Sequence, residues 1–133
     1  MNKCGIVTPL LLIVTTLICG CKDRSTPSWL RNVNLTNLVA EARLVAELGQ
    51  RQGEWYWPGG NTNLPPTIRS LASQKVILRT NPPPVRVEIS MRSGFSHNGV
   101  IIICESNAPV SLPRIGRDWR VRRLTDFVYE YKE

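Results

Sequence analysis

The chain has 133 residues, 42% of them hydrophobic, and its 17 Lys and Arg outnumber its 10 Asp and Glu to give a formal net charge of +7. This length indicates one domain, with enough residues to bury a modest core without cross-links. Three of the four cysteines lie within the first 21 residues. The remaining Cys104 excludes an intramolecular disulfide and a cysteine metal site in the body of the chain, and it is expected to pack as a small hydrophobic residue.

Residues 1–20 have the layout of a secretory signal peptide. Lys3 gives a basic start, and an apolar run follows from Ile6 to Ile18. This run is shorter than the about 20 apolar residues that a membrane-spanning helix needs, and Pro9 interrupts it. We therefore expect a signal peptide and not a permanent span.

The end of this segment resembles the lipobox of bacterial lipoproteins, in which a small residue precedes the lipid-bearing cysteine. Gly20 has the small side chain required there, and Cys21 follows it. Ile18 and Cys19 depart from the pattern, because Leu, and then Ala or Ser, are commoner at their positions. The resemblance implies cleavage before Cys21 and attachment of a lipid, typically carrying palmitate, to its sulfur. An uncleaved anchor and cleavage by the ordinary signal peptidase are the alternatives.

The lipoprotein resemblance implies a location, not an activity. It places the protein in the cell envelope, held on the periplasmic side of the inner or outer membrane through Cys21, where two or more acyl chains would anchor it firmly. In such lipoproteins, Asp directly after the cysteine retains the protein in the inner membrane. Lys22 occupies that position here, which favours the outer membrane. Without residues 1–20, whose single charged residue is Lys3, the net charge would be +6. Behind a secretory leader this charge indicates an anionic envelope component or an envelope protein as partner, and not nucleic acid.

Residues 21–33 are polar, contain a proline and predict a short lipidated tether, so that residues 34–133 form a single domain. Trp29 and Leu30, near the end of this tether, suit either contact with the membrane surface or a cap on the core.

A helix is predicted to follow the tether. Asn34 is a suitable N-cap, and Gly49 is expected to end the helix. Arg43 and Glu47 stand four residues apart, which adds a small local stabilisation. The apolar residues between the caps recur at helical spacing: Leu35, Leu38, Val39, Ala42, Val45 and Ala46.

Residues 50–63 are irregular, and Pro65–Pro66 can open a short helix that buries Ile68, Leu71 and Ala72. After this helix the apolar period changes to two, which indicates strands. The strands are expected at Val76–Leu78, Val85–Met91, Val100–Cys104, Trp119–Leu124 and Phe127–Tyr131. Asn98-Gly99 favours a tight reversal. The sequence thus predicts an α+β fold, a small antiparallel β-meander of four to five strands with one longer and one short helix packed on one face.

His97, the single histidine, is the first candidate for chemistry. Ser93 and Ser96 lie beside it and offer nucleophiles, which gives a small envelope hydrolase as an alternative function. A hairpin loop in which His97 is exposed or caps a strand end explains the same residues and is favoured. One histidine without neighbouring ligands supplies too few donors for a metal. We therefore expect no catalytic residues, metal or cofactor.

Trp55, Tyr56 and Trp57 form the second candidate site. Flat rings stack on sugars and cations, so the segment could bind a ligand. The favoured interpretation is a lid over the core, with Trp55 and Trp57 pointing to one side and Tyr56 to the other if the segment is extended. Contact with the membrane interface is a third possibility.

Arginines near the carboxyl end form the third candidate site. Five of them surround Trp119: Arg114, Arg117, Arg120, Arg122 and Arg123. Their forked donors suit phosphate or carboxylate ligands, and Arg120, Arg122 and Arg123 are the candidate contacts. Within a strand, Arg120 and Arg122 would share the face opposite Trp119, which is also typical of a solvated outer face.

Together these features predict a lipid-anchored envelope protein that acts as a non-enzymatic binding or accessory module. The alternatives are the hydrolase that uses His97 and a purely structural envelope component.

Overall fold

The structure, a computed structural model, describes residues 27–72, 74–93, 96–107 and 119–132. The signal peptide, Cys21, Arg114 and Arg117 lie outside the described residues. The elements in chain order are η1 (Ser28–Leu30), α1 (Leu35–Gln52), β1 (Tyr56–Pro58), α2 (Pro66–Leu71), β2 (Lys75–Arg79), β3 (Arg86–Ser93), β4 (Ser96–Ile103), β5 (Arg120–Arg123) and β6 (Val128–Lys132).

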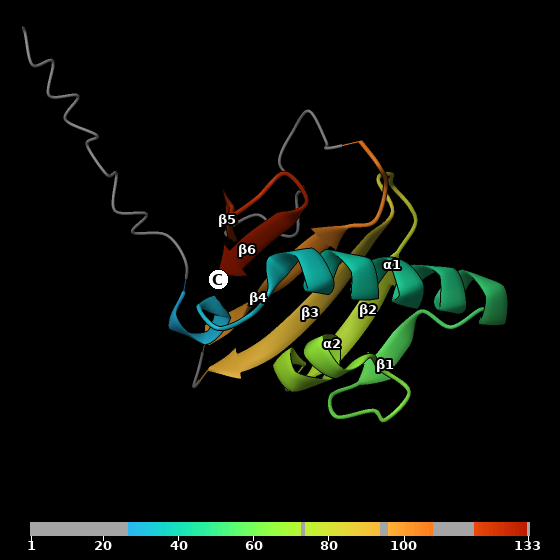
Figure 1. Cartoon of the computed structure of the whole chain (residues 1–133), viewed down its shortest axis with the longest axis horizontal. Helices are drawn as coiled ribbons and strands as arrows, with labels where there is room; N and C mark the ends of the chain where they lie inside the picture. Colours follow the sequence, from blue (N-terminus) through green and yellow to red (C-terminus); the bar gives the residue numbers. More distant parts are fainter. Residues whose placement is uncertain (1–26, 73, 94–95, 108–118, 133) are drawn as a thin grey trace, which may run out of the picture.

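The strands form one antiparallel sheet in the order β1-β2-β3-β4-β6-β5. Both α-helices pack on one face of this sheet, and α1 crosses it diagonally (Figure 1). The predicted α+β class is confirmed. The sheet differs from the predicted meander in two ways: β1 adds a sixth strand at one edge, and β6 lies between β4 and β5.

Alternation along the strands divides the apolar side chains between the two faces. Val87 and Ile89 of β3 and Val100 and Ile102 of β4 belong to the main core beneath the helices. The buried residues that α1 adds to this core are Leu38, Ala42, Val45 and Ala46. A second cluster lies on the opposite face and contains Ile101, Ile103, Tyr129 and Tyr131.

The predicted N-cap of α1 is confirmed. The side-chain oxygen of Asn34 accepts hydrogen bonds from the backbone N–H groups of Thr36 (3.0 Å) and Asn37 (3.1 Å), which satisfies two donors that the first turn leaves open.

The predicted end of α1 at Gly49 is wrong, because the helix continues to Gln52 and ends at Gly53, whose φ is 70°. Gly49 is a buried contact residue instead. A Cβ there would lie 2.6 Å from the carbonyl oxygen of Glu54 and 2.8 Å from the ring of Trp57. The glycine is needed for close packing and not for ending the helix.

The predicted reversal at Asn98-Gly99 is also wrong. Both residues lie inside β4, where Gly99 pairs with Ser90 of β3. The two strands instead meet through the pairing of Ser93 with Ser96, around residues 94–95, which lie outside the described set. Gly99 is required because Tyr131 crosses it: a Cβ there would lie 2.5 Å from the tyrosine hydroxyl oxygen.

The short helix α2 is confirmed, with Pro66 in its first turn and with Ile68, Leu71 and Ala72 buried. Glu41 of α1 fixes its position. The carboxylate of Glu41 accepts hydrogen bonds from the hydroxyl of Thr67 (2.7 Å) and the backbone N–H of Ile68 (3.0 Å).

The chain enters the core before α1 begins. Leu30 of η1 is only 1% exposed and belongs to the main core, and Trp29 and Val33 pack against it. Trp29 and Leu30 therefore cap the core, which is one of the two roles considered for them. The last residues of the expected tether pack on the domain. Within the described part of the chain, no helix combines the length and apolar character that crossing a bilayer requires.

Candidate functional site

The predicted aromatic and arginine sites lie at opposite edges of the sheet. Trp55–Trp57 lead into and form β1, and Arg120–Arg123 form β5. Four strands separate β1 from β5 (Figure 1). The two segments therefore do not combine into one binding surface.

Within the aromatic segment, Trp57 differs from its neighbours. Its side chain is 3% exposed, and its indole N–H donates a 2.9 Å hydrogen bond to the Glu54 carboxylate. Trp55 and Tyr56 are 47% and 57% exposed. Trp57 is thus a core residue, as the lid interpretation expected, while Trp55 does not share its buried side.

Two of the three candidate arginines are engaged with acidic side chains. Arg122 donates to the Glu130 carboxylate, with Nη2 2.5 Å from Oε2, and Arg123 pairs with Asp126. Arg120 is exposed. Because these ion pairs neutralise much of the charge, β5 presents a weaker anion site than the sequence indicates.

His97 lies in β4 and not in a loop, where its backbone pairs with that of Arg92. Its ring stacks on Trp119 with a centroid distance of 6.4 Å, and Trp119 stacks on Tyr131 at 5.1 Å. The Tyr131 hydroxyl shares a 2.9 Å hydrogen bond with Ser90, and burial raises the pKa of Tyr131. Among the described residues, no three His, Cys, Asp or Glu side chains group as a metal site would require.

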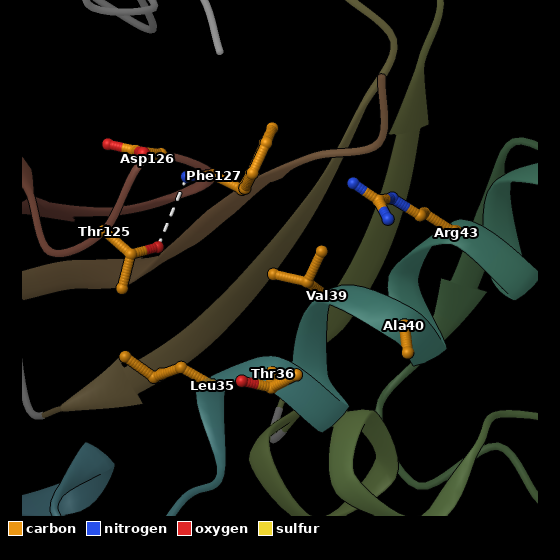
Figure 2. Close-up of a pocket in the computed structure, with 8 residues that line it drawn as sticks. All are labelled: Leu35, Thr36, Val39, Ala40, Arg43, Thr125, Asp126 and Phe127. Atoms are coloured by element: carbon orange, nitrogen blue, oxygen red, sulfur yellow. Dashed lines mark hydrogen bonds between the residues drawn. The ribbon is translucent and has the colours of Figure 1, made fainter. Parts of the chain in front are cut away.

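A cavity lies between α1 and the turn that joins β5 to β6 (Figure 2). We call it the α1 groove. It is lined by Leu35, Thr36, Val39, Ala40 and Arg43 on the helix and by Thr125, Asp126 and Phe127 on the turn. Its volume of about 440 Å³ is within the usual range for small-molecule sites.

Hydrogen bonds hold the turn wall of the groove in place. The Thr125 hydroxyl accepts from the backbone N–H groups of Phe127 (3.3 Å) and Val128 (3.1 Å). The backbone N–H of Leu124 donates to the carbonyl of Val128 (2.9 Å). The ring of Phe127 is therefore presented to the helix from a fixed backbone.

Arg43 is the cationic group of the groove. The carbon centre of its guanidinium lies 5.4 Å from the centroid of Phe127, and Nη2 donates a long 3.5 Å hydrogen bond to the Glu105 carbonyl. Its Nε atom is buried and has no hydrogen-bond partner within the described residues. A guanidinium carries five N–H donors, and leaving a buried donor unpaired costs about 1–3 kcal/mol. Because Nε is covered by protein, a ligand would meet Arg43 at its Nη groups, which can donate to an anion or another acceptor.

A second, smaller hollow of about 200 Å³ lies beyond Arg43. Its other lining residues are Ala46, Glu47, Gln50, Val85, Cys104 and Glu105. Glu47 and Glu105 make this side acidic. Cys104 is partly buried there, and its thiol donates to the carbonyl of Ala42 at 3.6 Å. Burial raises the pKa of Cys104 to about 12.

The raised pKa gives a prediction for Cys104. We expect iodoacetamide at pH 8 to modify this thiol at least about tenfold more slowly in the folded chain than in urea, because the thiolate is the reactive species. The neutral thiol favours the folded state below its ordinary pKa of 9.0, and this contribution declines as the pH rises from 9 toward 12. Mass spectrometry of the Cys104 peptide gives the rates, and equal rates in the two states would contradict the burial.

The sequence analysis assigned Arg43 only to a helical pair with Glu47 and did not find the α1 groove. The sequence signal for the groove is the four-residue spacing of Leu35, Val39 and Arg43, which puts these residues on one side of α1. Comparison with models of protein families, with curated proteins and with solved structures found no match to this chain.

Proposed function

We propose that this protein is a lipid-anchored, non-enzymatic binding module of the cell envelope. The anchor is the lipid on Cys21 that the leader implies. The binding site is the α1 groove, and its ligand combines an apolar part with an anionic group.

The observation that carries this proposal is the guanidinium of Arg43, whose exposed Nη2 makes a long 3.5 Å hydrogen bond to the Glu105 carbonyl and stands beside apolar walls. Val39 and Phe127 supply the apolar surface next to it (Figure 2). The one carboxylate on the turn wall, Asp126, is paired with Arg123 and leaves Arg43 available to a ligand. The lining side chains also include two hydroxyls, of Thr36 and Thr125, which are able to hydrogen-bond a ligand.

The groove can be tested with anilinonaphthalene sulfonate, a fluorescent probe that has both an anionic group and apolar rings. Because residues 27–132 contain both apolar clusters, we expect a chain that lacks residues 1–21 to fold, which circular dichroism checks. Arg43→Gln is expected to weaken probe binding by about 10- to 100-fold, since a charged hydrogen bond contributes about 1.5–3 kcal/mol. Arg51→Gln, an exposed change on the last turn of the same helix, is the matched control and should leave binding unchanged. Equal effects of the two substitutions would contradict the groove.

The anchor needs its own test. Cells that express the full chain are fed an alkyne-tagged fatty acid, and Cys21→Ser is expected to abolish both the label and recovery in the membrane fraction. Cys19→Ala and Cys104→Ser should keep both. An intact amino terminus, or an unlabelled product released into the medium, would contradict the lipid anchor.

A further inference from the structure

We infer that the ligand of the α1 groove is a single-chain amphiphile from the bilayer, with its anionic head group on Arg43 and its acyl chain along the groove toward Leu35. This inference rests on the proposed function and names the ligand class.

The position of the groove relative to the anchor is the first argument. Pro27, where the described chain begins, is six residues after Cys21, and an extended chain spans at most about 3.6 Å per residue. A lipid on Cys21 therefore keeps Pro27 within roughly 22 Å of the bilayer surface. Leu30 is fixed in the core, and η1 lies beside the start of α1 (Figure 1). The Leu35 end of the groove is thus held near the membrane.

The second argument is the order of chemistry along the groove. Leu35, Val39 and Arg43 follow one another at four-residue spacing, so about 12 Å separate the first from the last along the helix axis. The apolar lining lies on the anchored side of Arg43. Beyond Arg43 stand Glu47 and Glu105, which repel an anion. A head group is therefore stopped at Arg43, and its chain is directed back toward Leu35.

The third argument is the composition of the walls. A sugar or an extended peptide would need several free donors and acceptors along its length. Four of the eight lining residues are apolar, and two of the polar ones, Thr125 and Asp126, already bond to groups of their own turn. An acyl chain needs no such partners. Each buried methylene is expected to tighten binding about three- to fourfold until the groove is filled.

The test uses the full chain in isolated membranes, to which an alkyne-tagged, photoactivatable fatty acid is added. Irradiation is expected to give adducts on the peptide that carries residues 35–43 and on the peptide that carries Phe127. Arg43→Gln should lower these adducts at least about tenfold, whereas Arg51→Gln should not change them and Arg43→Lys should retain part of them. The fatty alcohol of equal chain length should label weakly.

A photoactivatable lysophosphatidylglycerol with the same chain distinguishes the source. If this lipid labels the groove more strongly than the fatty acid does, the ligand is a single-chain phospholipid. If the fatty acid labels it more strongly, the ligand is a free fatty acid. Equal labelling by acid and alcohol, or adducts confined to other peptides, would overturn the inference. If Arg43→Gln still weakens the binding of anilinonaphthalene sulfonate in that case, the groove binds another anion, such as a peptide, and the proposed function stands. If Arg43→Gln affects neither sulfonate binding nor labelling by the fatty acid, both proposals fail.

Discussion

Replacing Glu88 with Leu is expected to lower the free energy of unfolding by about 3–5 kcal/mol. Glu88 and Arg86 are 7% and 8% exposed, and the Glu88 carboxylate accepts from the Arg86 Nε at 3.0 Å and from the Arg79 Nε at 3.4 Å. Removing the carboxylate leaves the buried guanidinium of Arg86 with the carbonyl of Pro82 as its remaining partner among the described residues. Urea denaturation followed by circular dichroism measures the loss.

Two companion variants show whether charge is the cause. Glu47→Leu, at an exposed position of α1, should change stability by no more than about 0.5 kcal/mol. Combining Arg86→Met with Glu88→Leu removes both charges and should recover most of the loss, because an apolar pair has no charge to desolvate. A loss below about 1 kcal/mol for Glu88→Leu alone would show that water reaches Arg86 in the folded state.

Trp57→Ala is expected to destabilise the fold by about 3–5 kcal/mol. Its buried ring lies close to Gly49, its backbone pairs with that of Val76, and its N–H is bonded to Glu54. The substitution creates a cavity under β1 and removes that hydrogen bond. Urea denaturation measures the change.

Trp55→Ala and Tyr56→Ala are the matched controls, since both rings are about half exposed. Each should cost no more than about 1 kcal/mol. If Trp55→Ala were as damaging as Trp57→Ala, the assignment of the buried ring would be wrong.

The elements that the sequence predicted correctly are those fixed by local signals. Asn34 caps α1 with its own side chain, and alternation along β3 separates its two faces without reference to other strands. Gly49 and Gly99 were misread because a glycine marks an ending and a close contact equally well. The contacts that decide between these roles come from Trp57 and Tyr131. Trp57, which meets Gly49, lies in the unpredicted strand β1, and Tyr131 is distant in sequence from Gly99.

The candidate sites show the same limit. The runs at Trp55–Trp57 and Arg120–Arg123 are conspicuous in the sequence because their members are adjacent. The α1 groove is assembled from Arg43 and Phe127, 84 positions apart, and depends on the order of β4, β6 and β5 in the sheet. No local pattern specifies that order. Arg122 meets Glu130 across the β5–β6 pairing, and Arg123 meets Asp126 three residues further along the chain.

The length and composition of the two outer strands, β1 and β5, affect how copies of the chain can associate. An unpaired strand edge invites another chain to add a strand, and short, charged or proline-bearing edges oppose such polymerisation. β1 has three residues and ends at Pro58, while three of the four residues of β5 are arginines. Copies brought together edge to edge at β5 would place their exposed Arg120 side chains close to one another. Edge-to-edge addition of strands between copies of this chain is therefore opposed at both outer strands.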